Sequence, residues 1–150
     1  MNQKGELLEN LAPRDLFRIA MAASKAFPMI VIANLTKNTY TMIRDDGFLA
    51  HPLVSAGSYD DMIDSGVEDI HPNYQELFIK SFSRQNLIRS FETGKTDVYA
   101  ELYQKGYQEE EYHWVSTHVI RIENDEGDYV HVCLNRVLDG INEKRVNSRN

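Results

Sequence analysis

The pattern of apolar and polar positions predicts a helix, a strand pair, a helical middle and three further strands. In residues 13–27, apolar positions recur at the spacing of one helix face, and Pro13 suits the first turn of a helix. Pro28 blocks continuation of this helix. Residues 29–35 are rich in apolar and β-branched side chains, and residues 39–44 alternate polar and apolar side chains, which predicts a β-hairpin.

The middle of the chain predicts short helices. Ser58 is a suitable N-cap for a helix over residues 59–64 that Gly66 would end, and Ser83 could cap a later helix that Gly94 would end. Between these helices, one apolar stripe follows a third helix. Its members are Tyr74, Leu77, Phe78 and Phe82.

Three strands are predicted after the helices, at residues 98–103, 112–123 and 129–138, with a tight turn at 124–127. Five strands with helices grouped in the middle of the chain predict an α+β domain. Its sheet would be antiparallel, with the helices packed on one face.

Composition limits the classes of partner. The 150 residues suit one domain, and the net charge of -7 without a basic stripe argues against nucleic acid. No apolar run approaches the roughly 20 residues that cross a bilayer, and the N-terminus lacks the apolar core of a signal peptide. Cys133 is the one cysteine, which rules out an internal disulfide. We therefore expect a cytoplasmic protein without nucleic-acid or membrane partners.

The histidines offer few candidates for chemistry. His71 precedes Pro72 and is expected to cap a helix, with a metal or catalytic function as the alternative. His113 and His131 lie in strands that are expected to pair, so they could approach each other. His118 shares a strand face with Trp114 and could line an internal pocket, or could be a half-buried sheet histidine. No histidine pair has the spacing of a metal site on a helix, so we expect no metal and no catalytic residue.

Four segments in this order resemble the PAS domains of bacterial diguanylate cyclases and histidine kinases. They are "VIANLTKNTYTMI", "IHPNYQELFIKSFSRQNLIRSFETG", "YHWVSTHVIRIENDEGDYVHV" and the exit "LDGINEKR". The resemblance implies a PAS-like five-stranded antiparallel sheet with short helices on one face and an N-terminal amphipathic helix. It divides the chain into a flanking helix (1–26), a sensor domain (27–138) and an exit linker (139–150). The reactive helix cysteine of flavin photosensors and the helix histidine of many haem-binding relatives are missing, so no cofactor is expected.

The resemblance implies a sensor and dimerisation module that binds a small ligand or a partner. It would pass a conformational change to an output domain, such as a diguanylate cyclase or histidine kinase, that is absent from this chain. The candidates for a ligand pocket are Asn34, Phe78, Leu87, Trp114 and His118. The candidates for signal relay are Asp139, Asn142 and Glu143.

Two other functions stay open. One is a small α+β enzyme or ligand-carrying protein with a pocket behind a curved sheet, which would pair His118 with Asp97 or Glu101. The other is an interaction domain without a pocket.

The N-terminal helix generates a prediction about oligomeric state. Its stripe, which includes Leu16, Ile19, Ala20 and Ala23, needs an apolar partner, and the two alanines allow close approach of the same helix in a second chain. Light scattering coupled to gel filtration should find the full chain as a homodimer and a chain shortened to begin at Pro28 as a monomer or aggregate. A full-length monomer at tens of micromolar would contradict the dimer.

Overall fold

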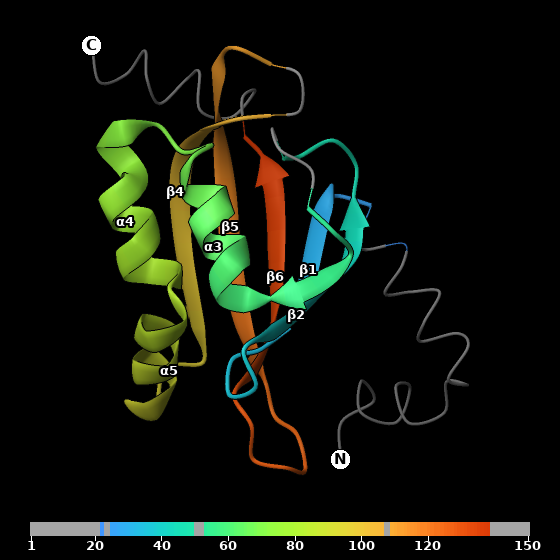
Figure 1. The fold of residues 1–150 in the computed structure, drawn as a ribbon, viewed down its shortest axis with the longest axis vertical. Coiled ribbons are helices and arrows are strands. Elements are labelled where there is room, and N and C mark those ends of the chain that lie inside the picture. The colour runs from blue at the N-terminus through green and yellow to red at the C-terminus, as the bar shows by residue number, and fades with distance from the viewer. Residues whose placement is uncertain (1–21, 23–24, 50–52, 107–108, 139–150) are drawn as a thin grey trace, which may run out of the picture.

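The structure is a computed structural model that describes residues 22, 25–49, 53–106 and 109–138. Within these ranges the chain forms one antiparallel sheet and three helices, α3, α4 and α5 (Figure 1). The sheet has six strands in the order β3-β2-β1-β6-β5-β4. The elements in chain order are β1 (Met29–Asn34), β2 (Thr39–Asp45), β3 (Ala56–Ser58), α3 (Tyr59–Val67), α4 (Pro72–Phe82), α5 (Arg84–Glu92), β4 (Asp97–Lys105), β5 (Tyr112–Ile122) and β6 (Val130–Val137).

The α+β class and the antiparallel sheet are confirmed, and all five predicted strands are present. The strand count needs correction from five to six, because β3 adds to the edge of β2. Its three residues, Ala-Gly-Ser, are too few and have side chains too small to show the alternation of polar and apolar positions that predicts a strand. Gly57 lies close to the Tyr40 ring, where an added Cβ would be 3.3 Å from Cε1. This pairing therefore depends on a contact that is distant in sequence.

The three helices gather on one face of the sheet (Figure 1). Helix α4 packs on β4 and against its neighbours α3 and α5. Each helix buries two large side chains in the core shared with the sheet, and these are Tyr59, Ile63, Phe78, Phe82, Leu87 and Phe91. The predicted inward stripe of α4 is correct for Phe78 and Phe82 and wrong for Leu77, which is 42% exposed.

His71 caps α4, as predicted. Its Nδ1 accepts the backbone N–H of Asn73 at 3.1 Å, and Pro72 is the first residue of the helix. The backbone N–H of His71 donates to the Tyr103 carbonyl, which fixes the start of α4 to β4. Ser58 likewise caps α3, because its hydroxyl accepts the N–H of Asp61. Ser83 precedes α5 without a side-chain capping bond.

The two predicted glycine stops have different outcomes. Helix α3 continues through Gly66 to Val67, because the helix packs on Phe78 there and tertiary packing overrides a helix-propensity cost of about 1 kcal/mol. Gly94 does end α5, at φ 96°. The N–H groups of Gly94 and Lys95 return to the carbonyls of Phe91 and Ser90, which is the Schellman pattern.

Several predicted elements lie outside the described residues. They include the N-terminal positions Leu16, Ile19, Ala20 and Ala23, and the exit positions Asp139, Asn142 and Glu143. Among the helices that the structure describes, none has the length and apolar character needed to cross a membrane.

The two glycines predict opposite effects of the same substitution. Gly94→Ala should lower the free energy of unfolding by about 1–2 kcal/mol, because alanine is strained at positive φ although its Cβ would have open space. Gly66→Ala should raise it by up to about 1 kcal/mol, because a helical Gly is replaced and the new Cβ would meet Phe78 at 3.4 Å. Urea denaturation measures the free energy of unfolding of each variant. A change of the same sign in both variants would contradict this account.

Candidate functional site

The candidate site is a cavity between the helical layer and the sheet. Its volume is about 60 Å³, which is room for roughly four water molecules. Helices α3 and α4 and the segment after β2 form one side, and four strands form the other. The lining residues are Met29, Val31, Phe48, Leu49, Leu53, Tyr59, Met62, Ile63, Gly66, Ile70, Phe78, Phe82, Gln104, Thr117, Val119, His131, Cys133 and Asn135.

Polar side chains of the lining come mainly from the sheet. His131, Cys133 and Asn135 alternate along β6 and therefore share the face toward the helices. Thr117 lies opposite Asn135 on β5, and Gln104 comes from β4. We call these five residues the polar floor. The helix side of the cavity is apolar apart from the Tyr59 hydroxyl.

His131 is the exceptional member of the polar floor. Its side chain is 1% exposed, and neither ring nitrogen has a hydrogen-bond partner among the described residues. The imidazole meets the Tyr59 ring edge-on, with ring centroids 5.7 Å apart. Burial lowers the pKa of His131 to about 4, so the ring is neutral at pH 7. Buried polar groups in folded proteins are nearly always paired, so these two nitrogens need an explanation.

The neighbouring groups do not supply a partner. The Tyr59 hydroxyl donates to the Phe82 carbonyl at 2.7 Å, and burial raises the pKa of this phenol well above its usual range. Burial also raises the pKa of the Cys133 thiol to about 12, and Asn135 makes a weak contact with its sulfur. A thiol with this pKa is protonated at neutral pH and is a poor nucleophile.

Solved structures of sensor domains resemble the fold of this chain. A sensory box histidine kinase/response regulator from Burkholderia thailandensis superposes with a TM-score of 0.56 at 13% identity, covering 88% of this chain and 92% of that chain. The N-terminal domain of a diguanylate cyclase with a PAS/PAC sensor from Marinobacter aquaeolei superposes with a TM-score of 0.50 at 17% identity, covering 74% and 94%. No protein-family model matches the chain. No curated protein matches it either.

The chain has a PAS-like fold. The resemblance inferred from the sequence motifs is thereby confirmed at the level of the fold. The extra edge strand β3 is an addition to the five strands expected from that resemblance.

The five predicted pocket candidates of this PAS-like domain lie in different places. Phe78 lines the cavity. Leu87 is fully buried in the core but does not contribute to the lining. Trp114 and His118 lie on the face of β5 opposite the cavity lining, since they alternate with the inward-facing Thr117. The Trp114 ring contacts Tyr74 of α4, with ring centroids 5.3 Å apart. Asn34 lies at the end of β1 and also does not contribute to the lining.

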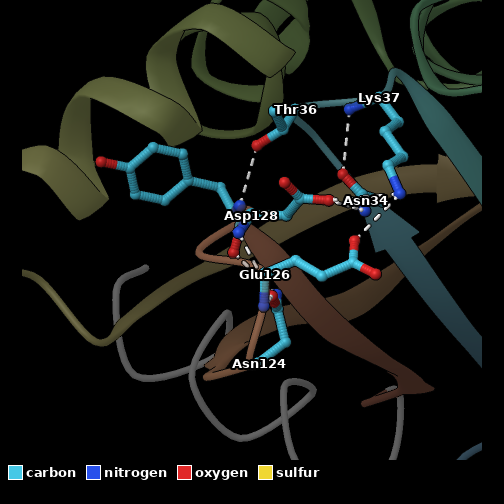
Figure 2. Close-up of polar contacts among 7 residues, drawn as sticks. Asn34, Thr36, Lys37, Asn124, Glu126 and Asp128 are labelled. Atoms are coloured by element: carbon cyan, nitrogen blue, oxygen red, sulfur yellow. Dashed lines mark hydrogen bonds and ion pairs between the residues drawn. The ribbon is translucent and has the colours of Figure 1, made fainter.

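Asn34 instead belongs to a network that joins two hairpin turns (Figure 2). Its Nδ2 donates to Asp128 at 2.9 Å, and its Oδ1 accepts the N–H of Lys37. Lys37 pairs with Glu126, and the N–H of Tyr129 donates to the Thr36 hydroxyl. These bonds fix the β1–β2 turn against the β5–β6 turn, which is a structural function.

The pair of a histidine and a carboxylate that an enzyme would need also lies outside the cavity. His118 Nε2 is 2.8 Å from Asp97 Oδ2, so the sequence correctly paired these two residues. Both side chains are partly exposed on the outer face of the sheet. Glu101 instead accepts a hydrogen bond from the Tyr99 hydroxyl. The predicted approach of His113 to His131 is not realised, because His131 lies opposite Arg121, and His113 pairs with Glu109.

The burial of His131 could not be predicted from the sequence, because the pattern of β6 suggests that its other face is the inward one. The alternate positions Val130, Val132 and Leu134 are apolar and would be assigned to the core, yet they are only partly buried. Their polar neighbours face the helices instead. Burial of the polar face of a strand is a departure from binary patterning, and such departures concentrate at functional sites.

His131 predicts a specific loss of stability in acid. Its pKa is lower in the folded state (about 4) than in the unfolded chain (6.5), so the unfolded chain takes up the proton first as pH falls. The stability contributed by the neutral ring is complete above about pH 6.5, and roughly 3 kcal/mol is lost as pH falls to about 4. Tyr59 and Cys133 do not titrate in this window, and Arg121 opposite His131 stays charged.

Urea denaturation across pH 7 to 4 should therefore show a smaller loss for His131→Phe than for the wild type. Phe keeps a ring against Tyr59 but has no group that titrates. His118→Gln, on the outer face, is the matched control and should keep the component of the loss that comes from His131. Equal pH profiles for wild type and His131→Phe would show that His131 is solvated in the folded protein.

Proposed function

We propose that this chain is a PAS-type sensor module that binds a small molecule in the cavity and relays binding to an output domain. The buried imidazole of His131, with two ring nitrogens unpaired among the described residues, carries the proposal. A molecule that pairs with them would remove a penalty of about 1–3 kcal/mol for unsatisfied buried polar groups. The similar sensor-domain structures support the same class of function.

The path of relay would run along β6. This strand carries His131, Cys133 and Asn135 and lies between β1 and β5 in the sheet. At its far end Asn135 pairs with Met29, the first residue of β1, and its Nδ2 donates to the Met29 carbonyl at 3.4 Å. A shift at the polar floor would thus reach the start of β1 and the end of β6. The segments 1–26 and 139–150 adjoin these two points, and Asp139, Asn142 and Glu143 would carry the change onward.

The outer face of the sheet supports a homodimeric arrangement. Apolar side chains on this face are exposed, including Ile32, Ile122 and Tyr99. A second chain would cover them together with the N-terminal stripe. Two copies would bring two output domains together. We propose a histidine kinase or diguanylate cyclase output, since the similar structures come from proteins of those two kinds.

We propose no catalytic activity for the module itself. The one His–Asp contact noted above is on the outer face, with the sheet between it and the cavity. A pocket enzyme would need that pair inside the cavity.

Native mass spectrometry of the full chain as purified tests ligand binding. The wild type should carry a noncovalent small molecule. Ile63→Phe, which fills the cavity, should lose it, because Ile63 is a buried lining residue of α3. Ile79→Phe is the matched control on α4, where Ile79 is 37% exposed and outside the lining, and it should keep the molecule.

Circular dichroism verifies that both variants fold. A wild type that carries no small molecule, and that no member of a metabolite library stabilises, would contradict the proposed function.

A further inference from the structure

We infer that the molecule bound in this cavity is a small, uncharged compound with an apolar end and a polar end, and that the polar end carries both a hydrogen-bond donor and an acceptor that can pair with His131. This inference rests on the proposed function and specifies the ligand for the same site. Three properties of the cavity carry it: the charge of its lining, the unpaired imidazole and the separation of polar and apolar walls.

The lining excludes a charged ligand. Among the described lining residues none is Asp, Glu, Lys or Arg. Arg121 lies opposite His131 but outside the lining, with its guanidinium over the Phe91 and Tyr129 rings. An ionised carboxylate, phosphate or ammonium group would therefore be transferred from water into a lining without a counter-charge, which is strongly unfavourable. A protonated His131 could neutralise an anion, but the buried ring is neutral at pH 7. The ligand is therefore uncharged.

The imidazole requires both a donor and an acceptor. A neutral ring has one N–H donor and one acceptor nitrogen, and neither is paired among the described residues. Tyr59, its ring neighbour, has already committed its hydroxyl to Phe82. An entirely apolar guest would leave both imidazole nitrogens unsatisfied. The two ring nitrogens point to opposite sides of the ring, so a group such as a primary amide, which carries N–H and C=O together, can pair with whichever nitrogen it faces, in either tautomer of the ring.

The walls of the cavity require an apolar end. The polar floor lies on the sheet side together with the apolar Met29, Val31 and Val119. The helix side is covered by apolar residues alone apart from Tyr59 among the described lining, including Met62, Ile63, Phe78 and Phe82. Water molecules filling the whole volume would lack partners at the helix wall, since a buried water needs two to four polar contacts. At about 60 Å³ the cavity is also smaller than the engineered cavity of about 150 Å³ that holds benzene. A compact amphiphile fits both walls and the volume.

Three probes of one shape separate these requirements. Acetamide, acetone and acetate each have four non-hydrogen atoms, a trigonal carbon and its three substituents. Acetamide is an uncharged donor and acceptor, acetone only accepts, and acetate is charged. Each is titrated into the full chain labelled with ¹⁵N-histidine, and the ring nitrogen shifts of His131 are followed by NMR. His131→Phe assigns the signals, and the His118 ring, outside the cavity, is the internal control.

Acetamide should shift both His131 nitrogens saturably, with an apparent affinity at least about tenfold higher than that of acetone or acetate. The His118 signals should not move in any titration. Acetone binding as tightly as acetamide would overturn the requirement for a donor. Acetate binding more tightly would overturn the requirement for an uncharged ligand.

The result also separates this inference from the proposed function. If the molecule found by native mass spectrometry is a carboxylate or a phosphate, the ligand class is wrong and the sensor function stands. If the protein carries a molecule but no probe moves the His131 nitrogens, the ligand does not use this imidazole and the inference fails alone. If no molecule and no probe binds, both fail.

Discussion

The hydrogen bond from the Tyr59 hydroxyl to the Phe82 carbonyl is the constraint on which the site depends. It joins the first residue of α3 to the last residue of α4, so it fixes the two helices that cover the cavity relative to each other. It also commits the only hydroxyl that the described lining residues offer on the helix side, so that Tyr59 meets the His131 ring in an aromatic contact without a hydrogen bond. One bond thus closes the helical layer over the cavity.

Much of the fold follows from local sequence, because its elements are marked by local chemistry. The pair His71-Pro72 and the residue Ser58 identify two helix starts, since a capping acceptor and a fixed φ act within one turn. Strand β3 was not predictable in the same way, because its pairing depends on Tyr40, which is distant in sequence. The continuation of α3 through Gly66 is also decided by tertiary packing, in this case against Phe78.

The site was less predictable than the fold, because a strand pattern shows two faces without saying which is inside. Phe78 was found because helical spacing defines a single inward stripe. The pattern allows His118 either in a pocket or as a half-buried sheet histidine, and the structure shows the second, because its face of β5 is the outer one. On β6 the apolar face of Val132 points away from the helices and the polar face of His131 points toward them. Hydrophobicity alone gives the opposite orientation, and only the three-dimensional pairing of β6 between β1 and β5 corrects it.

The energy available at the polar floor sets the size of the response that such a module could give. A ligand shifts a conformational equilibrium only by its difference in affinity for the two states. Two new hydrogen bonds to His131 contribute roughly 1–3 kcal/mol in total, if each gives the net value typical of folded proteins. This is the range of coupling energies found in allosteric proteins, and it corresponds to a change of about 5- to 150-fold in an equilibrium constant. Because His131 and Asn135 lie on the same strand face and Asn135 bonds to the start of β1, a displacement of β6 is the change through which the proposed relay would use this energy.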